Sequence, residues 1–405
     1  MKELFTLGEL YVSDFLKHDE DPRHRPVEMK LMMDNYGAVR LEKSAPLNTM
    51  YGKYWYRSGI NLTMKQELKD IVDSITKIKG PKTGDVWIDI ACNDGTLLSF
   101  LPDWLIKIGV DPADDSYRKE SEQFADLIIQ DYFSAKAFKE SKYGKLKADV
   151  VTTIAMFYDL ENPKPFINDV KDILNDDGIW VLQMSYTPLM LKQLAFDNIC
   201  HEHMYYYSLF NIMKILHECG MEVADVQLND VNGGSFRIWV MKAGRKHLVG
   251  SQPYRDVCKF RVESLLEYEY ILQLDDVETW QHFYKQINDL KGKTVEFIMK
   301  AKTEGKSIWA YGASTKGNTL LQYFGLDNSL ITAIAERSPY KFGLRTVGTN
   351  IPIVSEEEMR KANPDYLLVL PWHFINEFVK REEEFLNKGG RFIVPCPKFE
   401  IIGKQ

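Results

Sequence analysis

The chain has 405 residues, enough for two or three domains of about 150 residues each. Its hydrophobic fraction of 45% and charged fraction of 27% are those of an ordinary soluble protein, and its net charge is −7. A nucleic acid polymer and a membrane surface are therefore not expected as partners, since both require a concentrated basic face. With no long apolar run and no signal-like N-terminus, the sequence predicts a cytoplasmic protein.

The N-terminal region, residues 1–79, has mixed composition and ends in a predicted helix over about 63–78. Gly80-Pro81 then marks a boundary. Strand-like and helical runs alternate through residues 80–245, which predicts a mostly parallel sheet with an antiparallel edge. The expected strands are Val86–Ile90, Ile106–Val110, Asp126–Ile129, Asp149–Ile154, Ile179–Met184, Glu222–Gln227 and Phe236–Met241.

The third region, residues 246–405, begins with one or two long amphipathic helices over about 255–303. A second Rossmann-like domain is expected to follow. Its predicted elements are a strand at Ser307–Tyr311, a helix ending at Phe324, and strands at Ile331–Ala335, Tyr366–Leu370 and Arg391–Val394.

The segment Val86–Pro112 is the most informative part of the chain. An apolar strand leads into a polar turn that ends at Gly95, a helical run is expected next, and a second strand ends at Asp111. This is the βαβ pattern of a nucleotide-binding domain, with an acid where ribose hydroxyls would lie. Only Gly95 remains of a dinucleotide fingerprint, and Asp94 would repel a pyrophosphate but tolerate the cationic groups of S-adenosylmethionine (SAM). The turn therefore favours SAM over NAD; a strand, turn and helix without a ligand is the alternative.

The run from Cys200 to Ser208 places two imidazoles and a carboxylate at His201, Glu202 and His203. General acid–base chemistry suits a histidine that titrates near neutrality. Metal binding is a second possibility, although a third ligand at a standard spacing is missing. A polar cap at the surface is the third, and the three tyrosines that follow argue against it.

A lysine near the start of the last α/β region suggests an anion site. Lys316-Gly317-Asn318-Thr319 follows a strand and opens a helix, where backbone N–H groups and a lysine receive anions such as a pyrophosphate.

Short motifs along nearly the whole chain resemble one enzyme family. They are Tyr56–Gly59, Asn93–Leu98, Gly109–Pro112, His201–His203 with Tyr207-Ser208, Asn232–Arg237, Tyr311–Thr319, Glu336–Pro339, Gly348–Ile353 and Pro371-Trp372. Together they resemble the SAM-dependent sugar C-methyltransferases that act on nucleotide-linked keto-deoxysugars. In those enzymes a base removes the proton next to a ketone, and the enolate takes the methyl group of SAM, leaving S-adenosyl-L-homocysteine.

The resemblance implies an α/β protein of three parts: a small N-terminal domain (1–79), a Rossmann-like SAM-binding domain (80–245) and a second Rossmann-like, nucleotide-sugar-binding domain (246–405). By position, His203 is the expected base, oriented or assisted by His201 and Glu202. The expected SAM-binding residues are Tyr56, Ser58, Asp89, Ala91, Asn93, Gly95, Asp111, Pro112, Asp131 and Tyr132. The expected substrate-binding residues are Tyr207, Asn232, Lys316, Asn318, Glu336, Arg337, Lys341 and Trp372.

Two departures from the family pattern are visible. Family members usually bind zinc through four cysteines in the N-terminal domain, but the five cysteines here (Cys92, Cys200, Cys219, Cys258 and Cys396) all lie later and are scattered. No zinc or other metal is therefore predicted. Cys200 also stands where the family commonly has a tyrosine. These departures favour one alternative, a non-catalytic SAM- or nucleotide-sugar-binding protein. Two further alternatives are an O- or N-methyltransferase acting on a nucleotide-sugar, and an NAD(P)-dependent sugar oxidoreductase, which would suit two Rossmann-like halves although neither has the glycine pattern.

Overall fold

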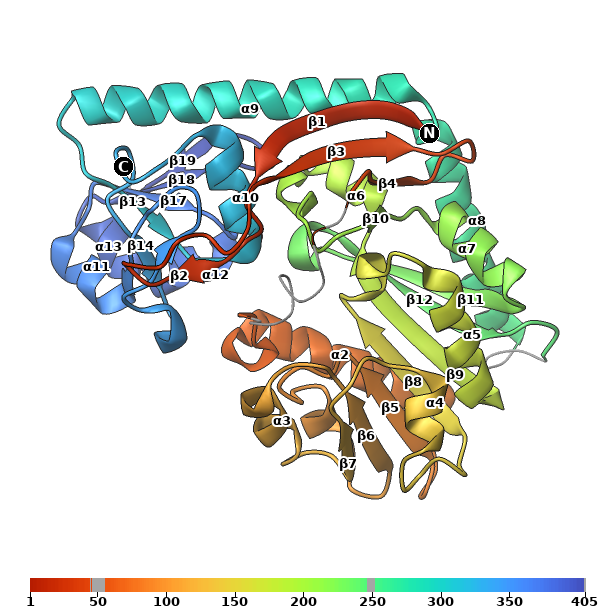
Figure 1. The fold of residues 1–405 in the computed structure, drawn as a ribbon. Helices are drawn as coiled ribbons and strands as arrows, with labels where there is room; N and C mark the ends of the chain where they lie inside the picture. The colour runs from red at the N-terminus through yellow and green to blue at the C-terminus, as the bar shows by residue number, and fades with distance from the viewer. Residues whose placement is uncertain (44, 46–54, 246–251, 404–405) are drawn as a thin grey trace. The chain divides into compact units, whose positions relative to one another are not determined.

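The chain forms two compact units in the computed structural model, which describes residues 1–43, 45, 55–245 and 252–403 (Figure 1). Unit 1 contains Met1–Met50, Pro188–His203 and Leu274–Gln405, and unit 2 contains Tyr51–Thr187 and Met204–Gln273. The three continuous domains predicted from the sequence, with boundaries at 79/80 and 245/246, stay a prediction, because the two units are defined by contacts and not by continuous ranges. Residues 246–251 lie outside the described part. Both units are built on parallel-rich sheets, which confirms the predicted α/β class.

Unit 2 is built on a seven-stranded sheet with the order β11-β12-β9-β8-β5-β6-β7. Only β12 runs antiparallel to its neighbours, so the predicted parallel sheet with an antiparallel edge is confirmed. The strands are β5 (Val86–Ile90), β6 (Ile106–Val110), β7 (Leu127–Ile129), β8 (Ala148–Ile154), β9 (Leu174–Ser185), β11 (Met221–Asn229) and β12 (Ser235–Lys242), and the short β10 spans Tyr205–Tyr206. Strand order reverses between β5 and β8, and in such sheets ligands bind at the carboxyl ends of the strands at this switch point.

The helices of unit 2 follow the apolar patterning of the sequence. In α2, Leu68, Ile71, Val72 and Ile75 face the same core as the sheet, and the left-handed Gly80 ends the helix, as predicted. The helices are α2 (Leu62–Lys79), α3 (Asp115–Ser121), α4 (Ala135–Lys139), α5 (Pro163–Ile173), α6 (Thr187–Lys192, which continues into unit 1), α7 (Leu209–Glu218) and α8 (Gln252–Leu272).

The prediction of a helix after the Gly95 turn is wrong. The segment contains only the 3₁₀ turn η2 (Leu98–Phe100). Pro102 explains the early end, because a residue that precedes proline is driven to extended backbone, and Leu101 has a ψ of 138°.

Unit 1 holds the second Rossmann-like sheet, with the order β16-β14-β13-β17-β18-β19. All neighbours are parallel except β18 and β19. Its elements are β13 (Ile308–Tyr311), α10 (Thr315–Phe324), β14 (Ile334–Glu336), β16 (Ile353–Ser355), α11 (Glu356–Ala362), β17 (Tyr366–Val369), α12 (Ile375–Arg381), α13 (Glu383–Asn387), β18 (Arg391–Val394) and β19 (Glu400–Ile402). Strand β14 begins later than the predicted Ile331, whose N–H is already bonded to Asp327 in a turn.

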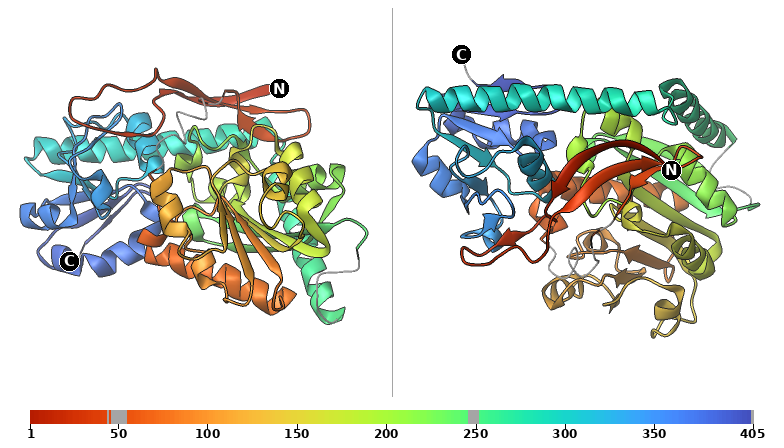
Figure 2. Two further views of the ribbon diagram at one scale, coloured as in Figure 1. Left: turned by 60° about the horizontal axis from the view of Figure 1, so that its bottom comes forward. Right: turned by 45° about the horizontal axis from the view of Figure 1, so that its top comes forward.

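The N-terminal residues add a small antiparallel sheet to unit 1. It contains β1 (Lys2–Leu10), β3 (Val27–Met33) and β4 (Val39–Leu41), and β2 (Phe15–Leu16) pairs separately with β15 (Arg345–Thr346). Helix α9 (Val277–Thr303) runs beside β1, and the ring of Phe5 stacks on Tyr284 with centroids 4.7 Å apart (Figure 2). Of the one or two long helices predicted around residues 255–303, the structure has two, α8 and α9.

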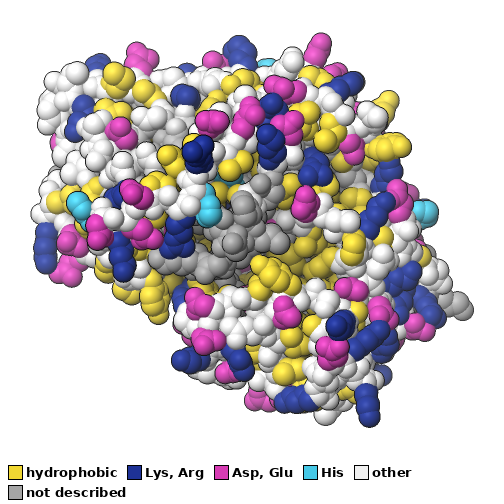
Figure 3. Space-filling model, in the orientation of Figure 1, with side chains coloured by type: hydrophobic (Ala, Val, Ile, Leu, Met, Phe, Trp, Pro, Cys, Tyr) yellow, Lys and Arg dark blue, Asp and Glu magenta, His cyan; other side chains and the backbone are white. Residues whose placement is uncertain are grey.

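The described surface mixes both charge signs. On the face drawn in Figure 3, Lys and Arg side chains lie interspersed with Asp and Glu. Within the described ranges, no helix combines the length and apolar character needed to cross a bilayer.

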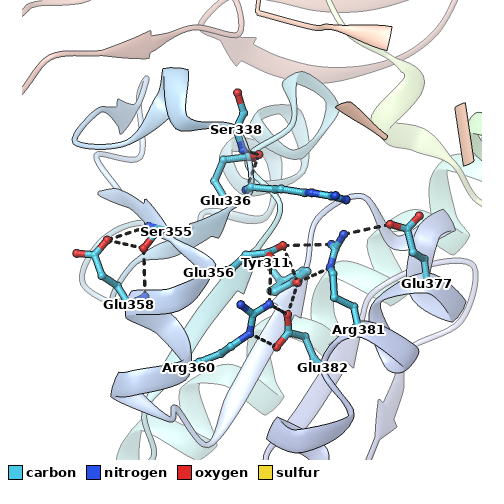
Figure 4. A network of polar contacts seen from close by, with 11 residues as sticks. Tyr311, Glu336, Ser338, Ser355, Glu356, Glu358, Arg360, Glu377, Arg381 and Glu382 are labelled. Atoms are coloured by element: carbon cyan, nitrogen blue, oxygen red, sulfur yellow. Dashed lines mark hydrogen bonds and ion pairs between the residues drawn. The ribbon is translucent and has the colours of Figure 1, made fainter. Parts of the chain in front are cut away.

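A partly buried ionic network joins strand β13 of the second sheet to helices α11 and α12 (Figure 4). The hydroxyl of Tyr311, at the end of β13, lies 2.8 Å from a carboxylate oxygen of Glu356 and 2.7 Å from one of Glu382, and it accepts from Nε of Arg381 at 3.0 Å. The guanidinium of Arg360 binds both oxygens of Glu382. Helices α11 and α12 are thereby tied to the sheet through side chains of opposite charge.

Candidate active site

Unit 2 presents a cradle at the carboxyl ends of β5 and β6. One oxygen of Asp111 accepts from the N–H of Asn93 at 2.8 Å, and the other accepts from the N–H of Ala113 at 2.8 Å. A carboxylate has about four lone-pair positions, so two remain for an adjacent pair of hydroxyls. The turn has positive φ at Ala91 (62°), Asn93 (53°) and Gly95 (77°), and a Cβ at Gly95 would lie 2.7 Å from the Cα of Ser121. These features fit the ribose end of SAM.

The predicted segment around Tyr56 and Ser58 lies against this turn. Asn93 donates from its amide to the carbonyl of Tyr56 at 3.0 Å and accepts from the N–H of Ser58 at 3.1 Å. Asp94 accepts from the N–H of Gly59 at 2.7 Å. The side chains of Asn93 and Asp94 thus hold the 56–59 segment over the turn.

The other predicted SAM-binding residues lie around the same strand ends. Asp89 is buried in β5 and accepts from the hydroxyl of Thr152 at 2.6 Å; burial, with the charge of Asp111 adding to it, raises its pKa to about 7. Pro112 follows Asp111 directly, and the N–H of Ala91 donates to Val110. Asp131 and Tyr132 come after β7, where the Tyr132 ring is half exposed.

A second polar cluster lies inside unit 1, around Asn198 in the short turn η4 (Phe196–Asn198). Nδ1 of His203 lies 2.8 Å from the main-chain carbonyl of Asn198, and Nζ of Lys316 donates to the side-chain oxygen of Asn198 at 2.5 Å. A carbonyl only accepts, so Nδ1 of the neutral imidazole carries the hydrogen and Nε2 carries the lone pair. Asn198 therefore connects the predicted base to the predicted anion-binding lysine.

The charges in this cluster act on one another. Burial, with the positive charge of Lys316 adding to it, lowers the pKa of His203 to about 3, so the ring is neutral at physiological pH. Burial raises the pKa of Glu202 to about 7, against the opposing pull of Lys316. Burial also lowers the pKa of Lys316, while Asp197, Cys200 and Glu202 act in the other direction.

His201 has different surroundings from its two neighbours. The backbone carbonyls of Leu10 and Val27 favour its charged form, but burial prevails and lowers its pKa to about 4. It faces the N-terminal sheet, whereas Glu202 and His203 interact with Lys316.

Several predicted substrate-binding residues of unit 1 have structural contacts. Glu336 accepts from the N–H groups of Ala313, Arg337 and Ser338 at 2.7–2.8 Å, and Nζ of Lys341 lies 4.0 Å from it. The amide of Asn318 donates to the hydroxyl of Ser13 at 2.8 Å. The three N–H groups occupy three of the about four lone-pair positions of Glu336, so this acid cannot accept from both hydroxyls of a ribose, which argues against an NAD(P) site there.

The remaining predicted substrate-binding residues lie at three places. The Arg337 side chain is exposed after β14. The indole N–H of Trp372 donates to Asp197 at 3.1 Å, next to the Lys316 cluster. In unit 2, Tyr207 is buried and stacks on Tyr205 with centroids 5.2 Å apart, and Asn232 occupies a turn with a φ of 55°.

Asp197 and Asn198 were not predicted from the sequence. Asp197 is buried, and burial raises its pKa despite the nearby charge of Lys316. Asp197 and Asn198 interrupt the apolar run before the histidines, and this interruption is the signal that could have identified them. Among the side chains the structure describes, no group of three or more His, Cys, Asp or Glu residues is arranged to hold a metal ion.

Comparison with known proteins identifies the class. Residues 60–226 match a methyltransferase domain, and residues 230–397 match a C-methyltransferase C-terminal domain. The chain belongs to the SAM-dependent C-methyltransferases. It is 28% identical over 359 residues to the C-methyltransferase NovU of Streptomyces niveus, covering 88% of this chain and 83% of that protein.

Solved structures similar to this chain include two methyltransferases. One is a SAM-dependent methyltransferase from Clostridium acetobutylicum, with 14% identity, a TM-score of 0.35, and coverage of 44% of this chain and 92% of that one. The other is the magnesium protoporphyrin IX methyltransferase of Synechocystis, with 15% identity, a TM-score of 0.36, and coverage of 48% and 91%.

Proposed function

We propose that this C-methyltransferase acts on a nucleotide-linked keto-sugar, removing the proton next to the ketone so that the enolate carbon is methylated. The observation that carries the proposal is the fixed tautomer of His203, whose Nδ1–H is held by the Asn198 carbonyl at 2.8 Å. Its Nε2 lone pair is therefore the proton acceptor. The sugar substrate is inferred from the motif resemblance, which covers both α/β parts of the chain.

His203 is suited to this task by its neutral state. A ring that is uncharged throughout the physiological range needs no deprotonation before it accepts a proton. The charge of Lys316 favours the ionised form of Glu202. We propose that Glu202 acts as a carboxylate that stabilises the imidazolium formed at His203. His201 is assigned a supporting role against the N-terminal strands.

SAM is proposed to bind at the Asp111 cradle, with Tyr56, Ser58, Asp89, Ala91, Asn93, Gly95, Pro112, Asp131 and Tyr132 around it. When bound, it supplies an electrophilic methyl group on a sulfonium. The two lone-pair positions left on Asp111 accept the ribose hydroxyls, and the negative turn at Asp94 disfavours a pyrophosphate.

Hydrogen–deuterium exchange at the sugar tests the function. The wild-type protein is incubated in heavy water with a thymidine-diphosphate-linked keto-deoxysugar and without SAM, and deuterium at the α-carbon is followed by NMR. Exchange is expected, because deprotonation precedes methylation. If the protein methylates this sugar without exchanging its α-proton, the O- or N-methyltransferase alternative is favoured. Binding without turnover over a panel of keto-sugars favours a non-catalytic protein.

Asp111→Ala is expected to weaken SAM binding about 100-fold. Two charge-assisted hydrogen bonds are lost, each contributing roughly 1.5 kcal/mol. Isothermal titration calorimetry with SAM measures the effect. Asp115→Ala, on the exposed side of α3, serves as the matched control and should bind SAM as the wild type does. An unchanged affinity for Asp111→Ala would remove Asp111 from the SAM site.

The value of kcat/KM should rise as the pH is raised through about 7. Glu202, whose pKa is raised to about 7, must lose its proton to stabilise the imidazolium, whereas His203, at about 3, does not titrate in this range. In Glu202→Gln the rise should disappear and the rate should be low and flat from pH 6 to 8. A rate that instead falls through pH 7 would show that protonated Glu202 donates to the enolate oxygen.

A further inference from the structure

We propose that Lys316 is a catalytic residue that stabilises the enolate oxygen, and that Asn198 is the positioning residue that holds it beside His203. The proposal rests on the proposed function. It replaces the role that the sequence suggests for Lys316, an anchor for the pyrophosphate at the start of α10.

The first argument is the direction of the side chain. Lys316 lies in the first turn of α10, but its ammonium reaches the side-chain oxygen of Asn198, which belongs to the segment that carries the histidines. The start of α10 is capped separately, since Ser314 accepts from the N–H of Gly317 at 2.9 Å. The ammonium group of Lys316 therefore lies at the segment from Asn198 to His203.

The second argument is that Asn198 binds both the ammonium group of Lys316 and the imidazole of His203. Asn198 holds Lys316 through its side chain and His203 through its main chain, and its own amide donates to the carbonyl of Ala195 at 3.1 Å. The cation and the imidazole are consequently fixed relative to one another. Deprotonation next to a ketone requires this pair: a base for the carbon-bound proton and a donor for the developing oxyanion.

The third argument is the charge around the ammonium. Asp197 and Glu202 are the carboxyl groups that interact with Lys316, and Asp197 is buried with one oxygen bonded to Trp372. A diphosphate at this position would meet two acidic groups. A ketone arrives uncharged, and it becomes negative only when the proton has left, at a point where a cation is already in place.

The step balances without a further reagent. The proton on the α-carbon moves to Nε2 of His203, the C–H electron pair forms the C=C bond, and the carbonyl π pair moves to the oxygen beside Lys316. The same carbon then forms its bond to the methyl group, the carbonyl is restored, and the S–CH₃ bonding pair stays with sulfur.

The test separates the two possible roles of Lys316 by using a probe that has a diphosphate but no ketone. Lys316→Met, Asn198→Ala and the control Lys361→Met, an exposed lysine of α11, are compared with the wild type. Calorimetry measures binding of UDP, TDP, GDP and CDP, and NMR measures α-proton exchange of the thymidine-diphosphate keto-deoxysugar at saturation. Melting temperatures establish that each variant is folded.

We expect Lys316→Met to bind the diphosphates within about 3-fold of the wild type and to lose α-proton exchange at least 100-fold. Asn198→Ala should reduce exchange by about 10-fold with the same diphosphate affinity, and Lys361→Met should change neither quantity. Diphosphate binding weakened more than 10-fold in folded Lys316→Met would overturn the inference in favour of an anchor and leave the proposed function standing. A wild-type protein that binds none of the four diphosphates, or binds the keto-sugar without exchange, contradicts the proposed function, and the inference with it.

Discussion

His203→Asn is expected to reduce kcat/KM for methyl transfer by about 1,000-fold, which is the range for loss of a general base. The asparagine amide places an N–H near the position of Nδ1, so the bond to the Asn198 carbonyl can persist. It removes Nε2, the atom that would accept the proton. The expected loss is therefore one of chemistry, with the local backbone kept in place.

Two measurements accompany this variant. SAM affinity, determined by calorimetry, should equal that of the wild type, because His203 is not among the residues proposed to hold SAM. His201→Asn is the matched control and should retain most of the activity, since His201 faces the carbonyls of Leu10 and Val27. Wild-type rates in His203→Asn would exclude His203 as the base.

Glu382→Ala is expected to destabilise unit 1 by about 2 kcal/mol, because a buried carboxylate that accepts hydrogen bonds is lost. The carboxylate is only 2% exposed and accepts from Arg360 and from the hydroxyl of Tyr311. Its removal takes one partner from the buried Tyr311 hydroxyl and from the guanidinium of Arg360, which is 42% exposed and keeps its contact with Glu356 at 3.0 Å. The melting temperature measured by calorimetry should fall by roughly 4–8 °C.

A surface carboxylate from the next helix provides the comparison. Glu384 pairs with Lys388 one turn later, and its side chain is 79% exposed. Glu384→Ala should therefore cost only about 0.3–0.5 kcal/mol. If both variants melt within a degree or two of the wild type, the network in Figure 4 contributes little to stability.

The fold could be predicted where burial alone determines the pattern. Strand β5 is buried along its whole length, so it reads as a continuous apolar run. Strand β1 of the N-terminal sheet could not be recognised in this way, because its register with β3 shifts between Glu3 and Phe5 and again between Thr6 and Glu9. Each shift interrupts the alternation of apolar and polar residues by which a strand is recognised.

The candidate site was predictable for residues whose side-chain chemistry is distinctive, such as His203 and Asp111. Asn198 was not, since it holds His203 through a main-chain carbonyl, which every residue has. Its other contact joins it to Lys316, 118 positions later in the chain. The three hydrogen bonds that Glu336 accepts likewise come from backbone N–H groups that only the folded turn brings together.

The composition of unit 1 from three separate stretches of chain limits how such enzymes can be recombined. A chimera that exchanges everything after residue 245 would combine Lys316 from one parent with Asn198 and His203 from the other. Residues 198, 203 and 316 should therefore change together between related enzymes, although they lie in different matched domains. A productive exchange of substrate preference would have to transplant residues 188–203 along with the C-terminal half.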